Sequence, residues 1–112
     1  MHLALREGPN FSPEEFARLD VVDANGHLLG KVTGLMVEPD GNKIRLLVVE
    51  GPELQIVPFD GARQDGGRLV VAVDMDAIRR APGLHSVKSP LPSEILGLFR
   101  HYGMVQNAAA SE

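Results

Sequence analysis

Short apolar segments separated by Gly, Pro, Asn and Asp fill residues 19–73. The segments expected to be strands are 19–23, 27–38, 43–50, 54–58 and 68–73. Asn25-Gly26, between the first two, is typical of a tight hairpin because both residues accept positive φ. Gly30 and Gly34 lie inside the second segment, where glycine usually marks a bulge or bend. The pattern predicts a mainly β fold, a small antiparallel barrel, with residues 60–67 as a polar loop.

The segment 43–50 is apolar on both of its faces. Its alternating apolar residues are Ile44, Leu46 and Val48 on one side and Leu47 and Val49 on the other. A strand with this pattern has one face on the core and the other covered by a further element. We expect Leu47, Val49 and Val57 to form apolar patches on the outside of the barrel.

One short helix is expected before the first strand and another after the last. Ser12, Pro13 and Glu15 have the spacing of a helix N-cap with a capping box. They predict a short N-terminal helix at 13–18 behind a loose leader, so residues 1–18 precede the barrel. Asp74 is a second candidate N-cap, for one helical turn at 74–80 that ends before Pro82.

The chain beyond the barrel segment 19–82 reads as a connector at 83–93, an amphipathic helix at 94–104 and a disordered tail at 105–112. The apolar stripe of that helix is formed by Leu91, Ile95, Leu98, Phe99 and Tyr102. Their spacing of three and four residues places them on one side of a helix. Gly103 is the predicted C-cap of this helix.

Composition narrows the class of protein. The 112 residues are enough for one domain, and the net charge of −4 argues against direct nucleic-acid binding, which needs clustered Lys and Arg. Cysteine is absent, which suits a reducing compartment. Neither a signal peptide nor a run of ~20 apolar residues is visible. We therefore expect a cytoplasmic protein without a membrane span.

Several of these segments resemble the PRC-barrel domain family. The resemblance rests on Val21-Val22-Asp23, Leu29-Gly30-Lys31-Val32, Pro39-Asp40-Gly41, the 44–50 strand and Ile56-Val57-Pro58-Phe59, and covers about residues 19–82. The family includes the cytoplasmic part of the photosynthetic reaction-centre H subunit and the C-terminal domain of a 30S ribosomal maturation factor. The resemblance implies a small β-barrel with adaptor roles and no catalytic residues. A stand-alone member is expected, because the H subunit's membrane helix and the maturation factor's second domain are missing.

Candidate chemistry is sparse. The four histidines, His2, His27, His85 and His101, match no metal-ligand spacing. Asp74 and Asp23 are interpreted as a helix cap and a turn residue, because short acidic side chains accept hydrogen bonds from nearby amides. Residues 60–67 lack the spacing of a phosphate loop. We expect no catalytic residues, no metal site and no cofactor.

The C-terminal stripe offers two alternatives, docking on its own barrel or on another chain. The leading hypothesis is a non-enzymatic adaptor, self-associating as a homodimer, whose partner surface is Leu91, Ile95, Leu98, Phe99 and Tyr102. A ribosome-associated or RNA-processing factor is the first alternative. A regulator that binds a small ligand or a metal is the second.

Overall fold

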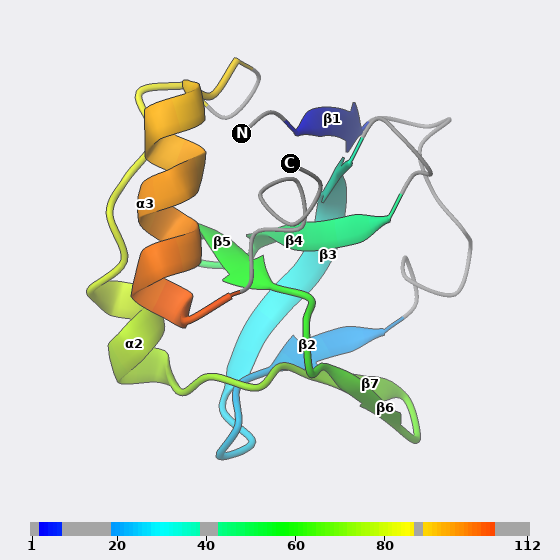
Figure 1. Ribbon diagram of the computed structural model, residues 1–112. Helices are drawn as coiled ribbons and strands as arrows, with labels where there is room; N and C mark the ends of the chain where they lie inside the picture. Colours follow the sequence, from blue (N-terminus) through cyan, green and yellow to red (C-terminus); the bar gives the residue numbers. More distant parts are fainter. Residues whose placement is uncertain (1–2, 8–18, 39–42, 87–88, 105–112) are drawn as a thin grey trace.

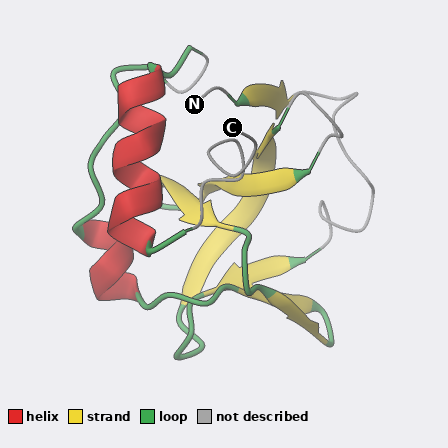
Figure 2. Ribbon diagram, viewed as in Figure 1, coloured by secondary structure: helices red, strands yellow, loops and turns green. Residues whose placement is uncertain are grey.

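The computed structural model describes residues 3–7, 19–38, 43–86 and 89–104. Within these ranges the chain forms one seven-stranded sheet and two short helices (Figures 1 and 2). The elements are β1 (Ala4–Glu7), β2 (Asp20–Val22), β3 (Leu28–Val37), β4 (Ile44–Glu50), β5 (Leu54–Pro58), β6 (Arg63–Asp65), β7 (Arg68–Val70), α2 (Met75–Arg79) and α3 (Pro92–Tyr102). No helix in the described ranges has both the length and the apolarity needed to cross a bilayer.

The strand order is β5-β4-β3-β2-β7-β6, with β1 paired beside β2 along β3. Because β5 and β6 are the unpaired ends of this path, the sheet is not closed into a barrel. The expectation of an all-antiparallel sheet is also wrong, since β2 and β7 run parallel. The chain passes from β5 at one end of the sheet to β6 at the other, and β7 then returns beside β2 in the same direction.

Two strands lie where the sequence predicted irregular chain. β1 pairs with Gly34–Val37 of β3, in place of the expected loose leader. β6 forms a hairpin with β7 across the Gly66-Gly67 turn, inside the expected polar loop 60–67. All three residues of β6 are exposed, so this strand has no apolar alternation to reveal it. The predicted helix at 13–18 and the tail 105–112 lie outside the described residues.

The apolar residues form two cores, one on each face of β4. The inner core contains Leu47, Val49 and Val57, all fully buried. The expectation that these three lie on the exterior is therefore wrong. The outward face instead carries Leu46 and Val48, and α3 covers them (Figure 1). The two-sided burial predicted for the 43–50 segment is confirmed, but Leu46 and Val48 lie on the side expected for Leu47 and Val49, and the reverse. Ile44, beyond the bulge, does not follow Leu46 and Val48 as predicted but packs against the inner core.

Arg45 is the largest fully buried side chain, with only 1% of its surface exposed. Consecutive residues of β3, Met36 and Val37, pair with Leu46 and Ile44 of β4. Arg45, which lies between these two, is therefore the extra residue of a β-bulge. Its guanidinium lies 4.8 Å from the centre of the Phe99 ring and forms ion pairs with Glu38 (2.8 Å) and Asp60 (2.9 Å). Burial favours a lower pKa for Arg45, but hydrogen bonds from the guanidinium to these two carboxylates outweigh it and raise the pKa.

α2 lies against β5, one of the two unpaired ends of the sheet, and buries Ile78 in the inner core. The predicted N-cap is confirmed: Asp74 accepts a hydrogen bond from the Ala77 amide at 2.9 Å. In the turn before β5, Gly51 passes so close to β3 that a Cβ on it would collide with the Leu29 carbonyl oxygen. The turn before β5 and the start of β3 are therefore held together.

Candidate functional site

The predicted partner-binding stripe of α3 is largely occupied within the chain itself. Ile95, Leu98 and Phe99 are fully buried in the outer core. The Tyr102 hydroxyl donates a hydrogen bond to the Ile56 carbonyl oxygen at 2.7 Å, and burial raises the pKa of Tyr102 to about 12. Leu91 alone of the five is exposed, at 50%. In the structure, α3 therefore docks on the sheet of its own chain, which is one of the two alternatives that the sequence left open.

The two ends of α3 are fixed by local contacts. Glu94 accepts hydrogen bonds from the Leu91 amide (2.9 Å), the His85 amide (2.9 Å) and the His85 ring (3.0 Å). The hydrogen bonds from Leu91 and His85 lower the pKa of Glu94 to about 2. The predicted C-cap is confirmed, since Gly103 has a left-handed φ of 69°. The helix is thus anchored at its start and end as well as along its apolar stripe.

Exposed leucines gather instead around the free end of the sheet. Leu28, at the start of β3, is 63% exposed, and Leu54, at the start of β5, is 53% exposed. Each borders a groove beside β5, and the two grooves share Glu53, Gln55 and Arg79. Large exposed apolar side chains next to concave surface are typical of interaction sites.

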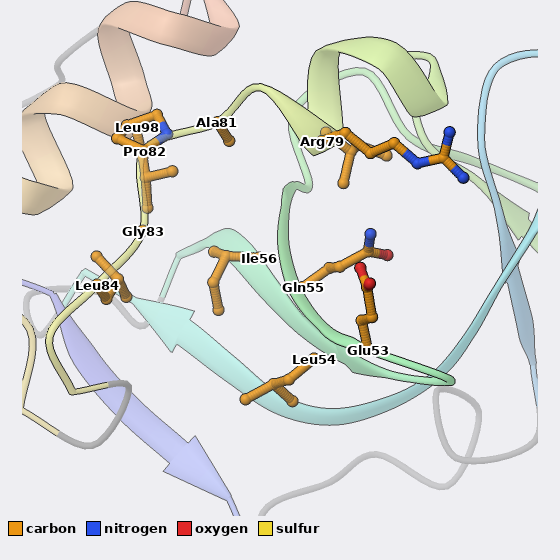
Figure 3. Close-up of a pocket in the computed structure, with 11 residues that line it drawn as sticks. Glu53, Leu54, Gln55, Ile56, Arg79, Ala81, Pro82, Gly83, Leu84 and Leu98 are labelled. Carbon is orange, nitrogen blue, oxygen red and sulfur yellow. The ribbon is translucent and has the colours of Figure 1, made fainter.

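The outer groove lies between β5 and the segment that joins α2 to α3 (Figure 3). Its volume is about 380 Å³, and its apolar lining includes Leu54, Ile56, Pro82, Leu84 and Leu98. Leu98 therefore has a second role, because the residue that docks α3 also forms part of this groove.

The inner groove has a volume of about 260 Å³. It is lined by Leu28 and Leu29 of β3, Pro52 of the preceding turn and Met75 of α2, besides the three shared residues. The open end of the sheet therefore has concave surface on both sides of β5. The sequence pattern did not indicate this face, because its residues come from four separate segments.

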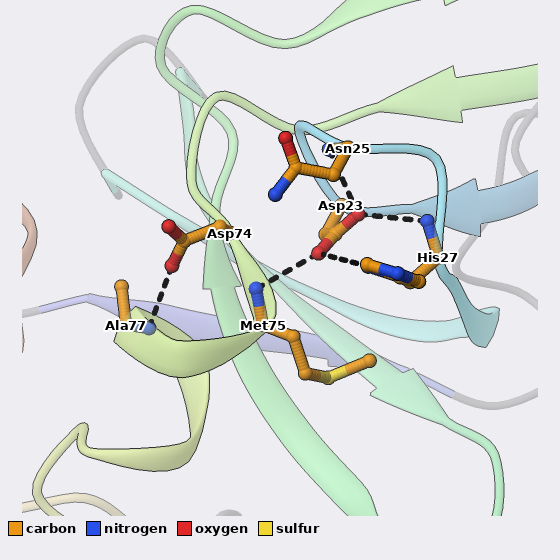
Figure 4. Close-up of polar contacts among 6 residues, drawn as sticks. All are labelled: Asp23, Asn25, His27, Asp74, Met75 and Ala77. Carbon is orange, nitrogen blue, oxygen red and sulfur yellow. Dashed lines mark hydrogen bonds and ion pairs between the residues drawn. The ribbon is translucent and has the colours of Figure 1, made fainter.

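Asp23 is buried with none of its surface exposed, and it joins two elements (Figure 4). Its Oδ1 accepts hydrogen bonds from the amides of Asn25 (2.9 Å) and His27 (2.7 Å), as expected for a turn residue. Its Oδ2 accepts one from the Met75 amide (2.8 Å), 52 residues away, and contacts the His27 ring at 3.1 Å. Burial raises the pKa of Asp23, but the bonds from His27, Asn25 and Met75 outweigh it and lower the pKa below 3.8.

The remaining candidate groups lie apart from one another. His27 contacts Asp23, His85 contacts Glu94, and the Nε2 atom of His101 lies 2.6 Å from the Ala77 carbonyl oxygen. Across the described part of the chain, no three His, Asp or Glu side chains are grouped as metal ligands would be. The arrangement offers an apolar docking surface with two flanking charged groups, Glu53 and Arg79.

Replacement of Phe99 by alanine tests the docking of α3. We expect Phe99→Ala to lower the free energy of unfolding by about 3 to 5 kcal/mol, because it opens a cavity under the helix and uncovers Arg45. The exposed neighbour gives a matched control, and Leu91→Ala is expected to cost less than about 1 kcal/mol. Urea denaturation measures both values. Equal small losses for the two variants would contradict the intramolecular docking.

Replacement of Asp23 by asparagine tests the link between the β2–β3 turn and α2. We expect Asp23→Asn to cost about 2 kcal/mol at pH 7, because an amide N–H₂ then faces a buried N–H donor. Since folding lowers the pKa of Asp23 below 3.8, its stabilisation is complete above about pH 4 and is lost as the pH falls further.

The difference between parent and Asp23→Asn is therefore expected to shrink in urea denaturation at pH 3. The matched control is Asp74→Asn, which keeps a good N-cap and is expected to stay within about 0.5 kcal/mol of the parent. A pH-independent difference, or equal losses in the two variants, would show that the carboxylate of Asp23 does not carry this link.

The family model of the PRC-barrel domain matches residues 9–78, which is more than half of the chain. No curated protein matches the chain significantly. The matched range contains β2 to β7 and most of α2, but neither β1 nor the residues after 78 that form one side of the outer groove. The chain belongs to the PRC-barrel domain family.

Proposed function

We propose that this PRC-barrel protein is a non-enzymatic adaptor that binds a protein partner with the face around Leu28 and Leu54. One observation carries the proposal: two large exposed leucines border two adjoining grooves at the unpaired end of the sheet. Burial of exposed apolar surface is the main favourable term in protein association. Apart from Leu91, the helix stripe that first suggested a partner is already packed within the chain, so the proposed surface moves from α3 to β5.

The side chains that could perform chemistry have structural partners in the described residues. Asp23 and Asp74 accept hydrogen bonds from backbone amides, and Glu94 holds the start of α3. These contacts favour a binding protein over an enzyme. The net charge of −4 favours a protein partner over RNA, so a ribosome-associated role would proceed through a ribosomal protein.

Affinity capture from a lysate of the source cells tests the proposal, with the double variant Leu28→Glu/Leu54→Glu. We expect the parent to enrich a partner protein that the double variant loses, because charges replace the apolar contact. The matched control is Leu91→Glu, which alters an equally exposed leucine at the start of α3 and is expected to retain the partner. All three proteins are expected to have similar melting temperatures, because each changed side chain is at least half exposed.

Light scattering on the same three proteins measures self-association. A dimeric parent with a monomeric double variant would assign this face to a second copy of the chain. Capture of the same proteins by the parent and the double variant would contradict the proposal. A panel of small ligands in a thermal-shift assay tests the rival role, because a ligand bound only by the folded state raises the melting temperature.

A further inference from the structure

We propose that the partner binds as an extended peptide segment, added as a further strand to the free edge of β5, with its side chains alternating between the two grooves. The inference rests on the proposed function and specifies the conformation and chemistry of the bound segment. It is argued from the orientation of the β5 backbone, the length of its free edge, the two grooves and the charges beside them.

The pairing of β5 with β4 fixes which backbone groups of β5 are free. Two hydrogen bonds beyond the ends of the pairing, Phe59 N to Arg45 O and Gly51 N to Glu53 O, show that odd-numbered residues direct their backbone groups at β4. In an antiparallel pair, the residues in between, here the even-numbered ones, direct their backbone N–H and C=O groups away from the partner strand. The amides of Leu54 and Ile56 therefore point outward. The hydrogen bond from Tyr102 to the Ile56 carbonyl oxygen is formed on that outward side.

The free edge is short and limited at one end. Pro58 has the same outward orientation as Leu54 and Ile56 but has no N–H to donate. The Tyr102 hydroxyl already contacts the Ile56 carbonyl, which retains a second lone pair. What remains for a further strand is the Leu54 N–H and C=O and the Ile56 N–H. An exposed edge of this kind is a template for an added strand.

The two grooves match the alternation of an added strand. Successive side chains of a strand point to opposite faces of the sheet. On the outward face, a side chain would enter the groove formed by Ile56, Pro82 and Leu98, which favours an apolar residue. The next side chain would enter the inner groove beside Leu28 and Met75. Binding through main-chain hydrogen bonds with alternate side chains in pockets is the mode of strand addition.

Both grooves are lined by one acidic and one basic side chain, Glu53 and Arg79, which can pair with a charged residue of the peptide. Figure 3 shows the side chains of Glu53, in the turn before β5, and Gln55, in β5, directed toward the side of the groove where Arg79 lies. Within the described residues, neither Glu53 nor Arg79 has an ion pair. A charged residue of the peptide next to its apolar anchor would therefore find a charge of opposite sign at the shared lining.

The groove also favours a single segment over a second copy of the chain. The segment 79–84 forms a wall opposite β5 and leaves the groove between them. Antiparallel continuation of the sheet would relate two copies by a two-fold axis. A second copy that paired through its own β5 would therefore place its own segment 79–84 on the same face of the joined sheet, where the two segments would compete for space. An extended peptide has no such wall. We therefore commit to a peptide segment of another protein.

The experiment compares two substitutions at one position. A displayed library of random dodecapeptides is selected on the full chain, and the affinity of a selected peptide is measured for the parent, Leu54→Ala and Leu54→Pro. Both variants remove the leucine side chain, but only Leu54→Pro removes the outward N–H. The ladder with β4 does not use that N–H, so the melting temperatures of both variants are expected to stay near that of the parent.

Strand addition predicts that Leu54→Pro binds the peptide at least tenfold more weakly than Leu54→Ala does. It also predicts that N-methylation of the peptide weakens binding at every second amide in the anchored stretch. Equal affinities of the two variants, an N-methyl scan without alternation, or a library that yields no binder would each overturn the inference. So would a dimeric parent that Leu54→Pro converts to a monomer, because a second copy would then occupy the edge.

Failure of the strand mechanism is distinguishable from failure of the adaptor function. If the capture partner is lost by Leu28→Glu/Leu54→Glu but is bound equally by Leu54→Ala and Leu54→Pro, the face binds a partner by side chains alone. In that case the proposed function stands and the strand addition is wrong.

Discussion

Burial of β4 on both faces is the constraint on which the rest of the structure depends. Leu47 and Val49 fill the inner core, while Leu46 and Val48 on the other face are apolar and need a cover of their own. An open sheet with two apolar faces is stable in water only when other elements cover both. The curved sheet and Ile78 of α2 cover the inner face, and α3 covers the outer one. The bulge at Arg45 joins these parts, because it places a cation beneath Phe99 between two carboxylates.

Because α3 docks within the chain, the end of the sheet at β5 is the surface proposed for a partner. A closed barrel would have no edge strand, whereas this sheet ends at β5. α2 contacts β5 and is tied to the β2–β3 turn by Asp23. Because the sheet is not closed at β5, α2 covers its inner side there. The two grooves lie beside this same open edge. On this account, the adaptor function proposed here depends on incomplete closure of the PRC-type fold.

Local signals in the sequence predicted the local structure well. Asp74 as an N-cap, Gly103 as a C-cap and the two-sided pattern of β4 are all confirmed, because each depends on residues close in the chain. Long-range pairing was not predictable in this way. The parallel contact of β2 with β7, the exposed strand β6 and the choice of inner face for Leu47 depend on where distant segments meet. The grooves were missed for the same reason, and so was the contact of Asp23 with Met75.

Amide hydrogen exchange at β5, measured by NMR in the free protein and with the selected peptide, tests the central claim most directly. The account predicts fast exchange at Leu54 and Ile56 in the free protein and slow exchange at Gln55 and Val57, which are bonded to β4. Bound peptide is expected to slow exchange at Leu54 and Ile56 alone among these four. Slow exchange at Leu54 and Ile56 in the free protein would contradict the account, because the edge would then already be covered.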